Sequence, residues 1–313
     1  MFMNEFGLKI MELLEERIDE DYTILKNSIV KANDIVKNAI TVQKRGENIA
    51  KNIYLEQFYQ MYKNGYAMEK IIDDVLKEVM SDNGFIMGDA SKELLKNIGD
   101  YEAIKNRIII KLLNRDMNKS YLEDKFYVPY KDLVVAFCIV WNGMGEGMAT
   151  SCVSKALFER WNVSEEQVYN QALKNSQSLF PAKIEDMRSV LLELYGSVKD
   201  LLGDEAYVPN DDNGKYFYVL SNESRLNGAA TMVYDDILKN FAYEQEVEEV
   251  IIIPSSIHEA LLVPKPHNAD NLEEKCYEMV NEVNSTSVEP EEILSNNIYI
   301  YSRIADEVTI WNK

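Results

Sequence analysis

The sequence predicts an α+β protein of two domains, each with a small, mostly antiparallel sheet and packed helices. Apolar residues at helical spacing alternate along the chain with short β-branched runs of strand length. Tight-turn pairs such as Asn142-Gly143 separate several of these runs and favour hairpins. A chain of 313 residues is long enough for about two domains. We place an N-terminal domain at 1–195 and an acidic C-terminal domain at 196–313, because the nearby segment YVPNDDNGK has the composition of an exposed connection.

In the first hundred residues, helical periodicity surrounds one hairpin. The segment 28–44, SIVKANDIVKNAITVQK, indicates two strands around Asn33-Asp34, because both residues tolerate turn geometry. Further on, Asn64-Gly65 supplies the left-handed residue that commonly ends a helix. Helices are expected over 4–19, 54–62, 68–79 and 91–98.

The middle of the chain carries the strongest strand patterns. Two apolar runs, RIIIKLLN at 107–114 and DLVVAFCIVW at 132–141, have the length and β-branched content of central strands of one sheet. The second run is expected to continue as a hairpin over 132–153. Ser164 and Gln167 have the spacing of a capping box, in which each side chain bonds the other's backbone amide at the start of a helix. The remaining expectations are a crossing loop or short helix over 114–125 and helices over 155–161, from 165 onward, and over 184–203.

The C-terminal half continues the same mixture. The segment DNLEEKCYEMVNEV spaces its apolar residues as one helical stripe after an Asp270 cap. The last two strands alternate apolar and polar residues around Ala305-Asp306, which is typical of a hairpin. Strands are expected over 216–221, 247–254, 297–304 and 307–311, and helices over 235–244 and 270–283.

The charge is large and unevenly divided. The net charge is −20, and residues 181–313 hold 26 acidic and 10 basic side chains, a net charge of −16. Such a surface repels phosphate backbones, so we expect no nucleic-acid partner. An acidic nucleic-acid mimic stays open as an alternative to a solvated acidic surface. Apolar runs stay short of the roughly 20 residues that span a bilayer, and the acidic N-terminus lacks signal-peptide features, so a cytoplasmic protein with no membrane partner is expected.

Neither the cysteines nor the glycines predict a metal or cofactor site. Cys138, Cys152 and Cys276 are odd in number and contain no C-x-x-C pair, so free, buried core thiols are expected. The two histidines, His258 and His267, have no carboxylates placed to complete a metal site. The G-x-G-x-G pattern at 143–147 lacks the lysine of a phosphate-binding loop, and a hairpin turn explains it. We therefore expect no cofactor.

The segment PSSIHE contains the weak catalytic candidates Ser256, His258 and Glu259. An imidazole within reach of a hydroxyl can act as its general base, which would make the protein a hydrolase. In an extended segment, however, Glu259 points away from Ser256 and His258, so a carboxylate such as Asp235 would have to complete a triad. The competing interpretation is a capping box, in which Ser256 caps a helical turn and Glu259 returns the bond.

A family resemblance enters through the C-terminal half. The segments LNGAATMVYDDILKNFA and IIIPSSIHEALLVP resemble bacterial proteins classed as domain of unknown function 5688, and IYLEQFYQMYKNG and YKDLVVAFCIVW extend the likeness over most of the chain. A more distant similarity, around DLVVAFCIVW and ERWNVSEEQVYNQALKN, is to the uncharacterised YtpQ proteins. Neither resemblance implies an activity or assigns a site residue.

The function predicted from these observations is binding or regulation without catalysis. Catalytic and phosphate-binding motifs are missing, and the acidic C-terminal half offers a surface for another protein. The chain is therefore expected to be a cytoplasmic protein that acts through protein–protein contacts. The alternatives are the Ser256–His258 hydrolase and the nucleic-acid mimic.

Overall fold

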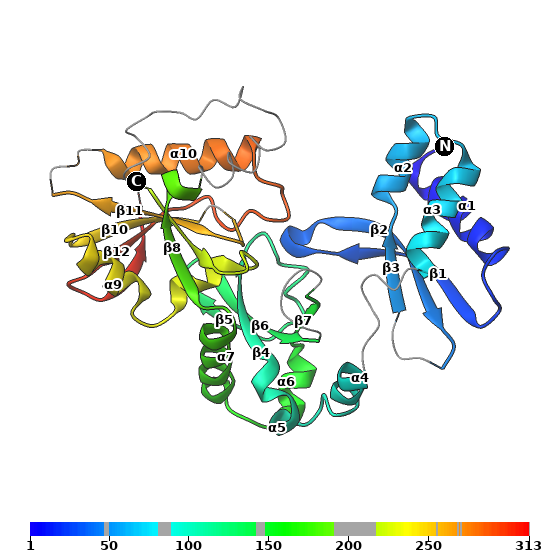
Figure 1. Cartoon of the computed structure of the whole chain (residues 1–313), viewed down its shortest axis with the longest axis horizontal. Helices are drawn as coiled ribbons and strands as arrows, with labels where there is room; N and C mark the ends of the chain where they lie inside the picture. Colours follow the sequence, from blue (N-terminus) through cyan, green and yellow to red (C-terminus); the bar gives the residue numbers. More distant parts are fainter. Residues whose placement is uncertain are drawn as a thin grey trace.

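The chain has the predicted α+β architecture and is divided into two parts in space. The computed structural model describes residues 1–46, 50–80, 89–141, 148–190, 217–254, 256–267, 269 and 271–312. Residues 3–80 form what we call the module, and residues 89–312 form what we call the body. Figure 1 shows them side by side, with one hairpin of the module reaching toward the body. No helix of the described residues is long and apolar enough to cross a membrane.

The module is a three-stranded antiparallel sheet with three helices. The strand order is β1-β2-β3, and β1 pairs with β2 from Tyr22↔Lys44 to Val30↔Val36, which confirms the predicted hairpin. Gly65 has a φ of 84°, as its predicted role at the end of a helix requires. The elements are α1 (Met3–Glu15), β1 (Tyr22–Val30), the 3-10 turn η1 (Ala32–Asp34), β2 (Val36–Lys44), β3 (Ala50–Tyr54), α2 (Glu56–Lys63) and α3 (Met68–Met80).

The first sheet of the body is built on the two apolar runs. They form β4 (Ile108–Asn114) and β6 (Leu133–Val140), which pair directly along their full length, as predicted. The other edge of β6 pairs with β5 (Tyr127–Tyr130) and then with β7 (Thr150–Cys152). The hairpin over 132–153 is thus confirmed in β6 and β7, while its predicted turn at 142–143 lies outside the described residues. Residues 115–124 form turns, in agreement with the crossing loop expected over 114–125, and the strand β5 that follows them was not predicted.

The helices beside this sheet close its open edge. The capping box at Ser164 is confirmed: the Gln167 amide donates to Ser164 Oγ at 3.2 Å, and Gln167 Oε1 accepts from the Ser164 amide at 3.0 Å. Near the other end of this helix, Ser176 Oγ accepts from the backbone of Ile110 at 2.9 Å, so a helix side chain occupies the edge of β4. The elements here are α4 (Asp89–Lys96), α5 (Tyr101–Ile104), η2 (Lys105–Arg107), α6 (Lys155–Trp161) and α7 (Glu165–Leu179).

The second sheet of the body has six antiparallel strands in the order β13-β12-β10-β11-β9-β8. The helix expected over 184–203 is wrong at its start, because residues 182–186 form a strand that pairs with 218–222; from 191 onward it lies outside the described residues. The predicted Asp270 cap also lies outside them, and the N-cap of the last helix is Asn271. The elements are β8 (Ala182–Asp186), β9 (Tyr218–Asn222), η4 (Gly228–Val233), α9 (Ile237–Glu244), β10 (Glu249–Ile253), β11 (Ala260–Lys265), α10 (Leu272–Thr286), β12 (Tyr299–Ser302) and β13 (Glu307–Ile310).

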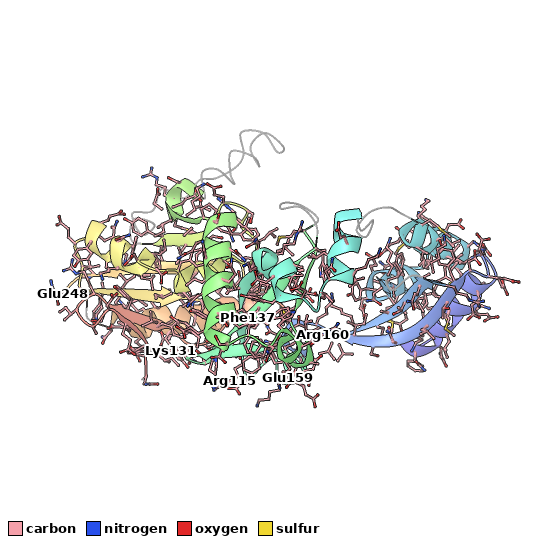
Figure 2. All side chains as sticks on the ribbon, turned by 90° about the horizontal axis from the view of Figure 1, so that it is seen from below. Arg115, Lys131, Phe137, Glu159, Arg160 and Glu248 are labelled. Atoms are coloured by element: carbon pink, nitrogen blue, oxygen red, sulfur yellow. The ribbon has the colours of Figure 1, made fainter. Side chains whose placement is uncertain are left out.

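The two parts have separate cores. Buried side chains between Phe6 and Val75 form one cluster within the module. A second cluster, from Leu94 to Val308, takes side chains from both sheets of the body. Figure 2 shows Phe137 inside this second part, and its side chain is 0% exposed. The predicted boundary at 195/196 falls in 191–216, outside the described residues; β8 before it pairs with β9 after it.

Candidate functional site: a polar cleft beside the hairpin tip

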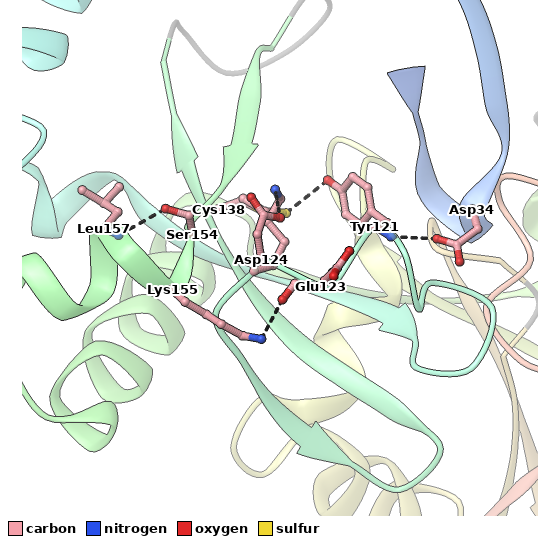
Figure 3. Close-up of polar contacts among 10 residues, drawn as sticks. Asp34, Tyr121, Glu123, Asp124, Cys138, Ser154, Lys155 and Leu157 are labelled. Atoms are coloured by element: carbon pink, nitrogen blue, oxygen red, sulfur yellow. Dashed lines mark hydrogen bonds and ion pairs between the residues drawn. The ribbon is translucent and has the colours of Figure 1, made fainter. Parts of the chain in front are cut away.

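The tip of the β1–β2 hairpin is seated on the body. Asn33 and Asp34 adopt φ angles of 56° and 52°, which these two residue types tolerate better than most. The two carboxylate oxygens of Asp34 accept the backbone N–H groups of Ser120 and Tyr121, each at 2.8 Å. Figure 3 shows the contact with Tyr121. Burial has the largest single effect on the pKa of the Asp34 carboxyl and raises it. The amide hydrogen bonds together outweigh burial, so the pKa is lowered overall.

A second polar contact fixes the position of the tip. Asn118 is fully buried, and its Oδ1 accepts from the Asn33 amide at 2.7 Å. Its Nδ2 donates to Asn33 Oδ1 at 2.7 Å and to the Asn114 carbonyl at 2.8 Å. Asn33 Nδ2 in turn donates to the carbonyls of Pro290 and Ile293, at 2.7 and 2.8 Å. Both side-chain amides are therefore held in one orientation by the body.

A cleft of about 650 Å³ lies beside this tip, with walls from both parts of the molecule. Its cationic side chains are Lys31 and Lys37 from the module and Lys111 from the body. The carboxylates of Glu56 and Glu78 face it from the module, and those of Glu291 and Glu292 face it from the body. The wall thus carries both signs of charge on both sides.

Several of these charges are already partnered. Lys37 Nζ lies 3.4 Å from a Glu291 carboxylate oxygen, and Lys31 Nζ lies 4.6 Å from the centre of the Tyr54 ring. Glu56 Oε1 accepts from the Asn38 amide at 2.7 Å, whereas Glu56 Oε2 is buried with no hydrogen-bond partner among the described residues. The Glu56 carboxylate therefore has unused hydrogen-bonding capacity at the wall of the cleft.

Burial perturbs a second carboxyl group of the wall. Desolvation raises the pKa of Glu78, while the charge of Lys51 and a hydrogen bond from Gln57 act in the opposite direction. The Gln57 amide donates to Glu78 Oε2 at 3.0 Å, and Lys51 Nζ donates to the Glu78 backbone carbonyl.

The candidate residues Ser256, His258 and Glu259 form a tight turn at the border of the cleft. Ser256 Oγ accepts the backbone N–H of His258 at 3.0 Å, and the Ser256 amide donates to the Glu259 carbonyl at 3.1 Å. The expected capping box is not formed. The Ser256 hydroxyl accepts from the amide two residues ahead instead of three, and no helix follows. Ile257, between them, lines the cleft.

The imidazole of His258 is placed between two groups that the sequence did not indicate. Its Nδ1 accepts from the Asn227 amide at 3.3 Å, and its Nε2 lies 3.5 Å from Glu292 Oε1. Gly228 permits this approach, because a Cβ there would collide with Ser221 Oγ and the His258 carbonyl. The carboxylate beside the histidine is thus Glu292 rather than Glu259 or Asp235.

The three cysteines are free, as predicted, but two of them are neighbours in space. Cys138 on β6 lies opposite Cys152 on β7, with their Sγ atoms 2.9 Å apart. The Tyr121 hydroxyl lies 3.5 Å from Cys152 Sγ (Figure 3). A tight turn at 142–143 would not place these two residues opposite each other, so nothing in the sequence beyond the hairpin itself indicated the pair.

The contact between the thiols shifts the pKa values of the two cysteines in opposite directions. The hydrogen bond with Cys138 is the main cause that lowers the pKa of Cys152, against the effect of burial; the Tyr121 hydroxyl and the charges of Lys111 and Lys125 add to it. The same hydrogen bond, together with burial, raises the pKa of Cys138. Among the described residues, no group of three or more His, Cys, Asp or Glu side chains could hold a metal ion.

A family model matches residues 3–303. The chain belongs to the family of unknown function DUF5688. This confirms the first resemblance found in the sequence, whereas the similarity to YtpQ proteins stays a prediction. No curated protein and no solved structure shows significant similarity to the chain.

The cleft is part of the DUF5688 domain. Its lining residues run from Lys31 to Glu292, so they all fall inside the matched range. The same holds for the thiol pair on β6 and β7 and for the hairpin tip. In chemical terms, the arrangement offers a polar cavity of ligand size with charges of both signs and a dithiol near one wall.

Proposed function

We propose that this DUF5688 protein is a non-catalytic binding or regulatory protein, and that its cleft takes an extended segment of a partner protein. The observation that carries the proposal is the composition of the cleft wall, which contains Lys31 and Lys111 together with glutamates from both parts of the molecule. Such a wall complements a peptide with charges of both signs, whereas a phosphorylated ligand would meet four carboxylates. A bacterial, cytoplasmic setting belongs to the same proposal, and the free thiols support a reducing compartment.

The two alternatives have less support. A hydrolase built on Ser256 and His258 needs a ring nitrogen directed at the hydroxyl, but the two nitrogens face Asn227 and Glu292. A nucleic-acid mimic needs unpaired carboxylates in rows, whereas Lys265, for example, pairs with Glu249 at 2.6 Å. Both alternatives remain predictions, and neither gives a use to the cleft.

The experiment is a selection of random dodecapeptides displayed on phage, using the wild-type chain as bait. Synthetic copies of the selected peptides are then titrated by fluorescence anisotropy against two charge-reversal variants. Lys31→Glu changes the cleft, and Lys44→Glu, at the exposed far end of β2 in the same hairpin, is the matched control. We expect Lys31→Glu to raise the Kd at least about tenfold and Lys44→Glu to change it less than about threefold.

Two outcomes contradict the proposal. One is that the selection yields no peptide with a Kd below about 1 mM, the weakest affinity that such a site could use. The other is that the selected peptides bind both variants equally, which would place the peptide site outside the cleft.

A further inference from the structure

The backbone around Cys138 and Cys152 has the geometry that a cross-strand disulfide needs. In the β6–β7 pair, the Val153 amide donates to the Phe137 carbonyl at 2.8 Å, and the Trp141 amide donates to the Ala149 carbonyl at 2.9 Å. These bonds alternate along an antiparallel ladder, so the cysteine pair between them occupies a non-hydrogen-bonded position. Opposed Cα atoms there are about 4.5 Å apart, which is within the range of disulfides.

The polar surroundings favour one thiol as the reactive one. The Tyr121 hydroxyl contacts Cys152 Sγ, and the ammonium groups of Lys111 and Lys125 add positive charge near it. Both features stabilise a thiolate at Cys152. Tyr121 itself is held by Asp34 of the module through its backbone amide, so the seating of the hairpin tip also positions this hydroxyl.

The two thiols differ in access. Tyr121, Lys111 and Thr150 all line the cleft, and Thr150 lies two residues before Cys152 on β7. Cys152 is half-buried, whereas Cys138 is only 2% exposed. Of the two thiols, Cys152 is thus in the more exposed residue, and its strand reaches the cleft at Thr150.

We propose that Cys138 and Cys152 form a redox-active dithiol that reduces small hydroperoxides, with Cys152 as the attacking sulfur and Cys138 as the resolving sulfur. In the first step, the Cys152 thiolate attacks the terminal peroxide oxygen. An S–O bond forms, the O–O bond breaks, and the leaving alkoxide takes up a proton and departs as an alcohol, or as water when the oxidant is hydrogen peroxide. The product on Cys152 is a sulfenic acid.

In the second step, Cys138 loses its proton and attacks the Cys152 sulfur. An S–S bond forms, the S–O bond breaks, and the hydroxide leaves with a proton as water. In total, two thiols and one hydroperoxide give one disulfide, one alcohol and one water, so the peroxide is reduced by the two electrons that the thiols lose. Return to the dithiol requires an external dithiol reductant. This inference rests on the strand pairing and the thiol contact. It adds a redox activity on β6 and β7 to the binding role proposed for the cleft, and the peptide site itself stays non-catalytic.

The test treats the reduced full-length chain with hydrogen peroxide at pH 7 and follows each cysteine by intact and peptide mass spectrometry. We expect the wild type to lose two hydrogens, to show a Cys138–Cys152 peptide, and to return to the starting mass with dithiothreitol. Cys138→Ser should stop at a Cys152 sulfenic acid, which dimedone traps. Cys152→Ser should leave Cys138 reduced.

Cys276 is the control within the same molecule. It is buried on α10, away from the pair, and burial raises its pKa to about 11. Cys152 should be oxidised at least about tenfold faster than Cys276 at pH 7. Tyr121→Phe should move the pH profile of Cys152 oxidation to higher pH, an effect that a purely structural role of Tyr121 would not produce. The circular dichroism of each variant confirms that it is folded.

Either of two results overturns the inference. The first is that Cys152 reacts no faster than Cys276. The second is that folded Cys138→Ser gives no dimedone adduct on Cys152 while the wild type still forms a disulfide, which would make Cys138 the attacking sulfur.

Discussion

The two junctions of this molecule are built differently. Inside the body, the four-stranded and six-stranded sheets share one buried apolar cluster. Between the module and the body, the hairpin tip packs one apolar residue, Ala32, against a buried cluster of the body. The neighbouring contacts, made by Asn33 and Asp34, are polar. Apolar burial stabilises a junction in proportion to area, whereas a few directional hydrogen bonds contribute little energy but define one geometry.

This difference bears on the cleft. Because the module has its own core, we expect it to keep its fold when its contact with the body is weakened. A small number of polar contacts, those of the hairpin tip and the Lys37–Glu291 pair, therefore set the width of the cleft. A ligand that binds both walls can shift such a junction by its differential affinity for the closed and open arrangements.

The largest effect on stability is expected from a substitution inside the body, at Asp132. Its carboxylate accepts from Ser295 Oγ at 2.6 Å, Asn297 Nδ2 at 3.0 Å and the hydroxyl of fully buried Tyr299 at 2.7 Å. Asp132→Ala leaves three donors without this acceptor and should lower the free energy of unfolding of the body by about 3 kcal/mol.

Urea unfolding followed by tryptophan fluorescence measures this effect selectively, because all three tryptophans, Trp141, Trp161 and Trp311, lie in the body. The control is Asp116→Ala, whose side chain is 65% exposed and should change the same free energy by less than about 0.5 kcal/mol. If the two variants unfold at the same urea concentration, the polar network at Asp132 does not join the two sheets.

A smaller effect is expected from Asn118→Ala, which weakens the junction between the module and the body. The change removes three hydrogen bonds, two of them to Asn33 of the module, and should weaken the seating of the tip by about 2 kcal/mol. Carbodiimide cross-linking of Lys37 to Glu291, whose charged groups are 3.4 Å apart, reports the seating directly.

The internal reference for that measurement is the Lys265–Glu249 pair, at 2.6 Å within the body. In Asn118→Ala, the Lys37–Glu291 product should fall relative to the Lys265–Glu249 product. An unchanged ratio would mean that the module is held by contacts other than the hairpin tip.

The sequence predicted the parts of the fold whose signal is local. The run that became β6 is apolar throughout, the run that became β4 is apolar apart from Lys111 and Asn114, and the Ser164 capping box depends on residues three positions apart. It failed for β8, because AKIED is only five residues long and runs directly into a helical pattern, which outweighed its short strand-like alternation. That segment is a strand because β9, which follows residues 191–216 in the chain, supplies its pairing partner.

The candidate site could not be predicted in the same way. Asn33 and Asn118 are 85 positions apart, and nothing in either neighbourhood indicates the other. The proximity of Cys138 and Cys152 depends on the register of β6 against β7, which the length of the connecting segment determines. The sequence indicated His258 as a candidate site residue. The carboxylate beside it belongs to Glu292, 34 positions further along the chain, and no local pattern links the two.

The smallest effect is expected at Asp34 and depends on pH. Asp34→Asn keeps one acceptor for the Ser120 and Tyr121 amides and loses the charge, which should cost about 1 kcal/mol at neutral pH. Because the folded protein lowers the pKa of Asp34, the carboxylate stabilises the fold above the unfolded pKa of about 4. This contribution is lost as the pH falls through the lowered pKa of the folded protein.

The measurement is the difference in Tm between wild type and Asp34→Asn as a function of pH. The other carboxyl groups are present in both proteins, so this difference isolates Asp34. That difference should be constant above about pH 5 and shrink below about pH 4. A wild-type advantage that persists unchanged at pH 3 would show that the Asp34 charge does not contribute to holding the hairpin tip, and the polar junction would then rest on the Asn33–Asn118 pair.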